Sequence, residues 1–178
     1  MAQQGVAGTT APRGKALDGG AGGITVPDYA VRFAGAMLAL AVTTVHVADQ
    51  GGVTALNSPD WIGWGYRTIE VGGVLTALVL LLPRPPRLAP AWLAPQWAGW
   101  AAGVLLGVGP FIAYILSRTV GVPGDAGDVG NWGYWVGTVS LLVEVALVTV
   151  SVSMLLALSQ HTIGDVLRRL AGRARTAG

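Results

Sequence analysis

Five ionisable side chains lie in or at the ends of long apolar segments of this chain, and they are the first feature that points to chemistry. They are His46, Asp49, Glu70, Arg118 and Glu144. A charge in hydrocarbon is costly, so such a residue usually faces the interior of a helix bundle, has a partner, and marks a functional site or an essential packing contact. These five residues are therefore the candidate site of this protein.

Two kinds of chemistry fit these residue types. The three carboxyl groups outnumber the one arginine and the one histidine, so one acid lacks a counter-charge. Burial favours the neutral form of an unpaired carboxyl group, and Glu144, deepest in its segment, is the expected protonatable residue of a proton or cation site. In the alternative, the residues form interhelical ion pairs that set helix register, first among them Arg118 with Glu144 or with Glu70.

A metal site is a weaker alternative. His46 and Asp49 are one helical turn apart in an HxxD pattern and could act as co-ligands. Zinc and non-haem iron sites normally use two or three histidines, whereas the second histidine, His161, falls at the opposite end of the apolar segments. We therefore expect no bound metal and no cofactor.

The elements that position these residues are membrane-spanning helices. Of the 178 residues, 52% are hydrophobic and only 11% are charged, which is too apolar for an ordinary soluble domain. An α-helix needs about 20 apolar residues to cross the hydrocarbon core. Four segments meet this need, at about residues 31–49, 65–82, 96–118 and 132–158. The expected fold is therefore all-α, a polytopic bundle of four transmembrane helices.

The basic residues predict the orientation of these helices. Nine of the eleven Lys and Arg residues lie before or at the start of the first segment, between the second and the third, or after the fourth. Because short loops rich in Lys and Arg stay in the cytoplasm, both termini are expected on the inner side of a bacterial cytoplasmic (inner) membrane. The cluster of five ionisable residues is then expected to face the outer side of the membrane. Counted from Trp135, Glu144 lies about 13 Å below the outer interface.

The two ends of the chain are predicted to be cytoplasmic tails. Residues 1–27 are rich in Gly, Ala, Thr and Gln, contain no apolar run, and are expected to be disordered. In residues 159–178, apolar residues at helical spacing alternate with arginines. This pattern is typical of a short basic amphipathic helix that lies on an anionic lipid surface.

Small residues predict where the helices touch, because lipid gives no hydrophobic drive for helix association. Gly99, Gly103 and Gly107 repeat every four residues on the third segment. On the fourth segment, Gly133 and Gly137 fall on the same face as Glu144. These five glycines are the expected packing positions.

The connection before the fourth segment carries Asp125, Asp128 and Asn131, one of which is expected to cap the fourth helix by accepting hydrogen bonds from free amide groups. The longer stretch from Leu116 to Glu144, with LSRTVGVPGDAGDVGNW followed by SLLVE, resembles a segment of uncharacterised four-helix membrane proteins from high-GC, actinobacteria-like genomes. The resemblance implies the fold, and it suggests that Arg118, Asp128 and Glu144 belong to one recurring unit.

Composition and motifs exclude several activities. Cysteine is absent, which excludes thiol–disulfide chemistry, and the single lysine, Lys15, lies in the N-terminal tail, which excludes a retinal Schiff base. No phosphate loop, nucleophile elbow or dinucleotide fingerprint is present. The net charge of +2 comes from basic residues beside apolar segments, which favours lipid headgroups over nucleic acid as partners. We expect that the chain is not an enzyme.

Two functions fit these observations. In the first, the chain is an accessory or structural subunit that packs through its glycine-rich helix faces, either as a homo-oligomer or in a larger membrane complex. In the alternative, it is a small proton- or cation-coupled transporter or sensor that uses Glu144 and the neighbouring acids.

Overall fold

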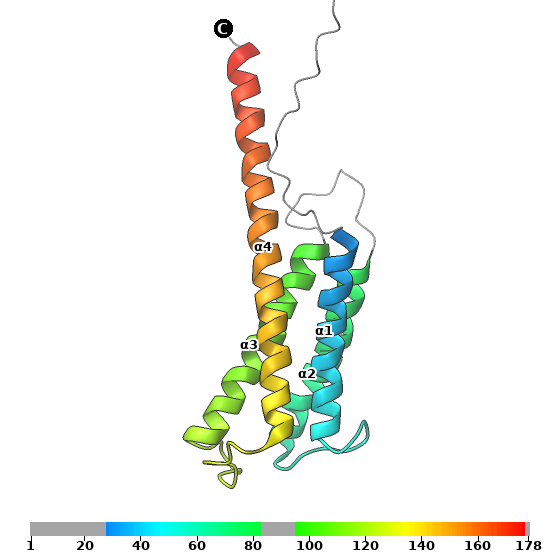
Figure 1. Cartoon of the computed structure of the whole chain (residues 1–178), viewed down its shortest axis with the longest axis vertical. Coiled ribbons are helices and arrows are strands. Elements are labelled where there is room, and N and C mark those ends of the chain that lie inside the picture. Colours follow the sequence, from blue (N-terminus) through cyan, green and yellow to red (C-terminus); the bar gives the residue numbers. More distant parts are fainter. Residues whose placement is uncertain (1–27, 83–94, 177–178) are drawn as a thin grey trace, which may run out of the picture.

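Four α-helices make up the computed structural model, which describes residues 28–82 and 95–176. They are α1 (Asp28–Asp49), α2 (Asp60–Leu81), α3 (Pro95–Thr119) and α4 (Trp135–Thr176). Consecutive helices run in opposite directions, and both α1 and α3 pack against α2 and α4 (Figure 1). The prediction of an all-α chain with four helices is confirmed.

Three of these helices contain a segment that is long and apolar enough to cross a membrane. The segments are Tyr29–Asp49 of α1, Gln96–Thr119 of α3 and Trp135–Gln160 of α4. α2 is as long as α1 but does not qualify. Its charged residues Asp60, Arg67 and Glu70 lower its hydropathy. The chain is thus consistent with a multi-pass membrane protein.

Three helices begin away from the expected residue, and α1 starts three residues early, at Asp28. α2 starts at Asp60, five residues early, where a negative charge is favoured beside the free amide groups. α4 starts at Trp135, three residues late. Gly133 therefore lies in the preceding loop, and a Cβ placed on it would meet no atom within 4 Å. Its expected role in helix packing was wrong, because the glycine-rich stretch before Trp135 disfavours a helix.

The end of α4 also differs from the prediction. The short separate amphipathic helix expected after residue 158 was wrong, because α4 continues without a break to Thr176 and projects past the other helices (Figure 1). No proline interrupts this 42-residue helix, and its Leu, Ala and Arg residues favour helix. At about 1.5 Å per residue, α4 is roughly 60 Å long, about twice the hydrocarbon thickness.

Two further expectations fall on residues that the structure does not describe. The tail at 1–27 lies outside the described residues, and so do residues 83–94 and 177–178. Most side chains after residue 160 are also outside the description. The disorder expected for residues 1–27 and the lipid contact expected for residues 159–178 stay predictions.

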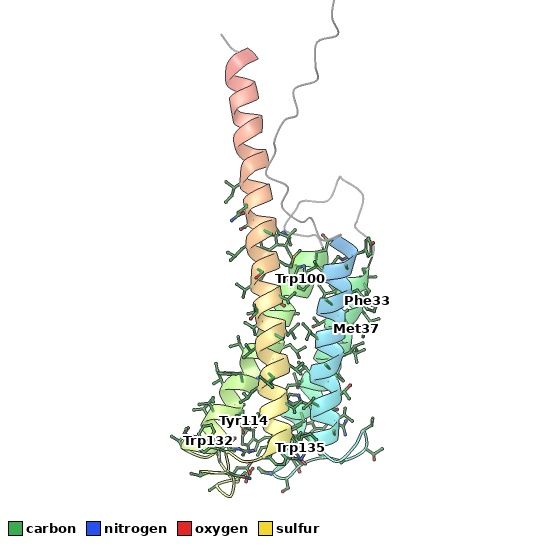
Figure 2. All side chains as sticks on the ribbon, viewed as in Figure 1. Phe33, Met37, Trp100, Tyr114, Trp132 and Trp135 are labelled. Carbon is green, nitrogen blue, oxygen red and sulfur yellow. The ribbon has the colours of Figure 1, made fainter. Side chains whose placement is uncertain are left out.

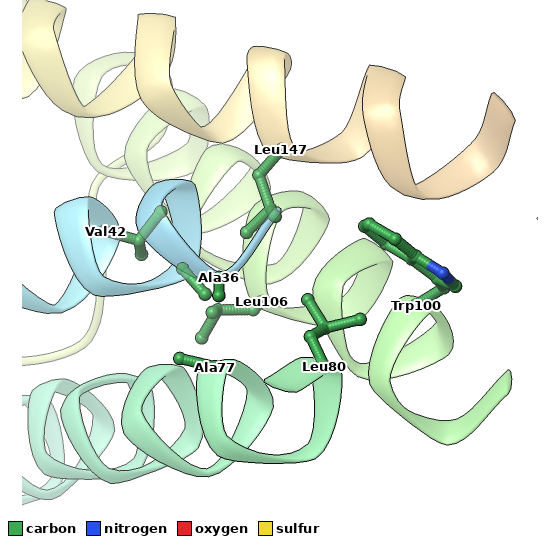
Figure 3. Packing of buried hydrophobic residues seen from close by; sticks show 8 residues of the cluster. Ala36, Val42, Ala77, Leu80, Trp100, Leu106 and Leu147 are labelled. Carbon is green, nitrogen blue, oxygen red and sulfur yellow. The ribbon is translucent and has the colours of Figure 1, made fainter. Parts of the chain in front are cut away.

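The bundle is tightly packed in the half where α1 begins and α2 ends. Leu80, Trp100 and Leu147 come from three different helices and are fully buried together (Figure 3). At this end Arg32 of α1 donates from Nε to the backbone oxygen of Leu80 at 2.7 Å. Phe33 and other large apolar side chains point outward (Figure 2), as in a bundle surrounded by lipid.

Four of the predicted packing glycines lie where two helices meet, namely Gly99, Gly103, Gly107 and Gly137. A Cβ on Gly107 of α3 would lie 2.8 Å from the backbone oxygen of Glu144 in α4. On α4, Gly137 faces the ring of Tyr114 in α3. At Gly107, α3 and α4 thus approach so closely that no side chain fits between their backbones, and at Gly137 the missing side chain leaves room for the ring of Tyr114.

Glycines of α1 and α2 were left out of the predicted packing positions. A Cβ on Gly73 of α2 would lie 2.7 Å from the backbone oxygen of Ala39 in α1, and Gly35 of α1 faces the ring of Trp100. Gly35 and Ala39 are four residues apart, as are Gly73 and Ala77. This small-xxx-small spacing is the signal that could have found them.

Gly107→Ala tests the close approach of α3 and α4. The added Cβ meets a backbone atom that cannot move aside alone, so we expect a loss of about 1–3 kcal/mol in the free energy of unfolding. The matched control is Gly109→Ala on the same helix, where a Cβ meets nothing within 4 Å. Thermal unfolding in detergent measures both variants. Equal stability of the two variants contradicts the packing described above.

Candidate functional site

A cavity of about 400 Å³ lies at the end of the bundle formed by residues 50–59 and 120–134, which we call the loop end. All four helices and both connecting loops contribute to its wall. Four of the five predicted site residues line it, namely His46, Asp49, Arg118 and Glu144. Tyr114, Trp132 and Trp135 gather at the same end (Figure 2), and exposed tryptophans there are typical of a membrane interface.

Arg118, in the last turn of α3, is buried beneath the loop that leads to α4. Its guanidinium forms an ion pair with Asp128 of that loop. It also lies over the ring of Tyr114, 4.7 Å from the centroid, and 5.8 Å from the centroid of Tyr134. The amide of Gly130 donates to the backbone oxygen of Arg118 at 2.9 Å. The loop is thus folded over Arg118 and supplies the carboxylate that this buried cation requires.

Asp49, the last residue of α1, is held by two phenol groups. Tyr66 of α2 donates its hydroxyl to one carboxylate oxygen, and Tyr134 donates to the other at 2.5 Å. The hydrogen bond to Asp49, together with partial burial, raises the pKa of Tyr134 to about 12. The Tyr134 hydroxyl therefore remains a donor at neutral pH. Asp49 joins α1, α2 and the loop before α4 at one point.

His46 and Glu144 face each other farther inside the bundle. His46 Nδ1 lies 2.9 Å from the backbone oxygen of Val42. Because a carbonyl only accepts, Nδ1 carries the proton and Nε2 is the free acceptor of the neutral ring. Nε2 lies 3.8 Å from Oε1 of Glu144. Oε1 accepts from Ser140 at 2.5 Å, whereas Oε2 has no hydrogen-bond partner among the described residues.

This pair can hold one proton in two ways. Glu144 is a neutral acid beside a neutral imidazole, or it is a carboxylate beside an imidazolium. The distance of 3.8 Å exceeds a direct hydrogen bond but allows an ion pair. Glu144 is only 1% exposed, so its carboxylate form lacks the solvation that water would give. Proton binding by Glu144 and His46 therefore depends on the other charged groups in the cavity.

Glu70 is buried as well, but it does not line the cavity. It pairs with Arg67, one turn earlier on α2, and accepts a hydrogen bond of 3.3 Å from Gln50. Arg67 also donates to the backbone oxygen of Ala55. Glu70 thus belongs to a second network, which ties α2 to the α1–α2 loop. The structure separates it from the other four predicted residues.

The predicted ion pairs of Arg118 with Glu144 or Glu70 were wrong. Arg118 forms its ion pair with Asp128 of the adjacent loop, and Glu70 forms its ion pair with Arg67. Both partners are close in sequence to the residue they pair with, and an ion pair costs less when fewer segments must be ordered to form it. The third helix therefore does not bind the fourth through an Arg–Glu pair.

Sequence reasoning also misassigned or overlooked residues of the site. Asp125 and Asp128 were expected to offer a cap for α4, but α4 begins seven residues after Asp128, and Asp128 serves Arg118. Tyr66 and Tyr134 were not among the predicted site residues. The sequence held a signal for both tyrosines. Each follows a small or flexible stretch and lies at the same predicted depth as Asp49. A buried phenol needs a hydrogen-bond acceptor, which Asp49 offers.

The metal alternative requires His46 and Asp49 as ligands, but polar atoms of both side chains already take part in hydrogen bonds. Asp49 accepts two phenol hydrogen bonds, and His46 donates from Nδ1 to Val42. In residues 28–82 and 95–176, no group of three or more His, Cys, Asp or Glu side chains could hold a metal ion.

Comparison with protein-family models, with curated proteins and with solved structures found no match for this chain. The resemblance of the stretch from Leu116 to Glu144 to actinobacterial four-helix proteins stays a prediction. Function must therefore be argued from the site itself.

Asp128→Asn tests the buried ion pair. It leaves the guanidinium of Arg118 without a counter-charge, and we expect a loss of about 2 kcal/mol in the free energy of unfolding, below the cost for a fully buried pair because Asp128 is partly exposed. Asp125→Asn in the same loop is the control, with an expected effect within about 0.5 kcal/mol. Chemical denaturation in detergent compares them. A loss of equal size in both variants argues against a specific pair.

Proposed function

We propose that this chain is a four-helix protein of a bacterial cytoplasmic membrane, with both termini inside and the loop end outside. The nine-to-two distribution of basic residues supports this orientation. α2 is proposed as the fourth span because it lies between α1 and α3 along their length (Figure 1). Its charged residues Arg67 and Glu70 pair with each other, which lowers the cost of placing them in the membrane.

Within that membrane, we propose that the chain acts as a small proton- or cation-coupled transporter or sensor that uses Glu144. The observation that carries this proposal is the cavity, which extends from the loops to Glu144 without an Arg118–Glu144 contact. A carboxyl group used only to set helix register has no need of a path to the surface. Glu144 instead combines deep burial, an unpartnered oxygen and a place on the cavity wall.

The remaining acids of the site support this role from their positions. Asp49, held by two tyrosines, gives the outer part of the cavity a carboxylate that attracts cations. His46 presents Nε2 to Glu144 and offers a second place for the same proton. Opposite the loop end, Leu80 and Trp100 are packed without exposed surface. A sensor needs only this one-sided access, whereas a transporter needs a second state that opens at the other end.

Glu144→Gln is expected to abolish proton exchange in the cavity. Infrared difference spectra of the reconstituted protein, taken across a pH step, report the carboxyl band of an acid that gains or loses its proton. In the wild type we expect one such buried band. In Glu144→Gln it should be absent, and in the control Glu70→Gln, which alters a buried acid outside the cavity, it should persist.

A band that survives in Glu144→Gln, or a wild-type band that does not respond to pH, overturns the proton role. Vesicles that enclose a pH-sensitive dye then separate the two forms of the proposal. Proton flux in the wild type that is lost in Glu144→Gln identifies a transporter. Exchange in the infrared without flux identifies a sensor.

An accessory or structural subunit is the second candidate, and one observation favours it. A largely apolar groove of about 580 Å³ runs between α2 and α3 on the outside of the bundle. Its floor is formed by small residues, among them Gly72, Ala102 and Gly109. Such a groove fits a further membrane helix, of a second copy or of a larger complex. Two other glycines of α3, Gly103 and Gly107, already pack against α4.

Cysteine substitution tests this groove cleanly, since the chain has no cysteine of its own. Leu105→Cys places a single thiol beside the groove, and Phe33→Cys places one on the outer face of α1, both at exposed residues. In native membranes, we expect a partner helix to slow maleimide labelling at residue 105 by about tenfold relative to residue 33. Equal labelling rates at the two positions count against a subunit docked in the groove.

A further inference from the structure

We propose that the loop-end cavity binds a monovalent organic ammonium ion, with Glu144 as its principal counter-charge. The inference rests on the proposed function and names the solute class of that same site. Three independent features of the cavity carry it: an excess of carboxylates, aromatic side chains beside them, and one deeply buried carboxylate oxygen that lacks a partner.

The charges on the cavity wall favour a cation. Four carboxyl groups line it, from Asp49, Asp125, Asp128 and Glu144, against the single guanidinium of Arg118. Asp128 neutralises Arg118. Among the described residues, Asp49 and Asp125 form no ion pair, and Glu144 faces only the imidazole of His46 as a possible counter-charge, across 3.8 Å. One added positive charge therefore improves the balance, whereas an added negative charge worsens it.

Glu144 gives this acidic wall a specific point of contact. Its side chain is almost completely buried, yet it lines the cavity, and its Oε2 has no hydrogen-bond partner within residues 28–82 and 95–176. A buried polar atom without a partner is costly and rare in a native structure. A cation held in the cavity beside Glu144 supplies the missing counter-charge.

The wall between the carboxyl groups suits an organic ion better than a bare one. Tyr66, Tyr114 and Trp61 contribute aromatic rings, and Ile69 and Ala113 contribute apolar surface. Aromatic faces attract ammonium groups, and the guanidinium of Arg118 over Tyr114 is an instance in this same cavity. Alkyl groups of an organic cation pack on the apolar wall. A hard metal ion instead requires about six oxygen ligands.

The size of the cavity agrees with this solute class. A volume of about 400 Å³ is at the small end of the range of ligand pockets. It admits a small ammonium compound with its alkyl groups and leaves the loop end as the route of entry.

Proton and solute then compete for Glu144. The protonated acid is neutral and attracts a cation weakly, whereas the carboxylate attracts it strongly. Titratable groups from every neighbouring element share the cavity with Glu144: His46 and Asp49 from α1, Tyr66 from α2, Tyr114 and Arg118 from α3, and Asp125, Asp128 and Tyr134 from the loop before α4. A protonated His46 opposes the solute further, because it places a positive charge beside Oε1. Binding of the solute should thus release a proton and strengthen as the pH rises.

Choline and its uncharged isostere, 3,3-dimethyl-1-butanol, test the proposal as a matched pair. They share one shape and differ in the quaternary nitrogen. With the full chain in nanodiscs, isothermal titration calorimetry should show choline binding at least about tenfold tighter than the alcohol, because only choline carries a positive charge that a buried carboxylate attracts. Glu144→Gln should remove that preference. Glu70→Gln should keep it, because Glu70 is equally buried but does not line the cavity.

A second variant guards against misfolding. Glu144→Asp keeps the charge and should retain a measurable preference for choline, whatever its effect on stability. Equal affinity for the two probes in the wild type, no binding of choline, or tighter binding of the anion 3,3-dimethylbutanoate each overturns the inference.

The same samples keep this inference separate from the proposed function. A pH-responsive infrared band at Glu144 without choline preference overturns the ammonium site and leaves the proton role standing. Choline preference that depends on Glu144 without any pH-responsive band supports the ammonium site and overturns the proton coupling.

Discussion

Polar groups buried between packed helices have to find their partners inside the protein, because water does not reach them there. This constraint organises the loop end. Arg118 holds Asp128 and, with it, the loop between α3 and α4. Asp49 holds the phenols of Tyr66 and Tyr134 and so joins three elements. The loops are therefore positioned by buried ionisable groups rather than by apolar contacts, and the cavity is the space that these contacts enclose.

Glu144 lies at the border between two kinds of interior. One turn farther along α4, Leu147 is fully buried against the apolar core. On the other side, Ser140 and Gly137 belong to the cavity wall. Gly107 of α3 allows the backbone of α4 to come close at Glu144 itself. Close packing below and open space above leave this carboxyl group shielded from water yet reachable from the loops, which is the environment in which proton binding responds to a nearby charge.

The sequence predicted the elements better than their contacts. Hydropathy located all four helices, and the four-residue spacing of Gly99, Gly103 and Gly107 found a real contact face of α3. Helix-face arithmetic also oriented Glu144 inward, although it could not choose its neighbours. The partners of Arg118 and Glu70 were predicted across the bundle, whereas both came from nearby in sequence, because side-chain reach and loop path are invisible to a helical projection.

Sequence alone determined that this chain is helical and apolar, which residue types carry its charge, and that charge is scarce enough for each instance to matter. The apolar content and the spacing of the apolar residues are local properties of the sequence, so they can be recognised without knowing the fold. Tertiary structure alone decided which acids share a cavity: Asp49 and Glu144 line it, while Glu70 turns to Arg67 and Gln50. That division depends on how helices rotate against one another, and their rotation is set by close backbone contacts that no single segment contains.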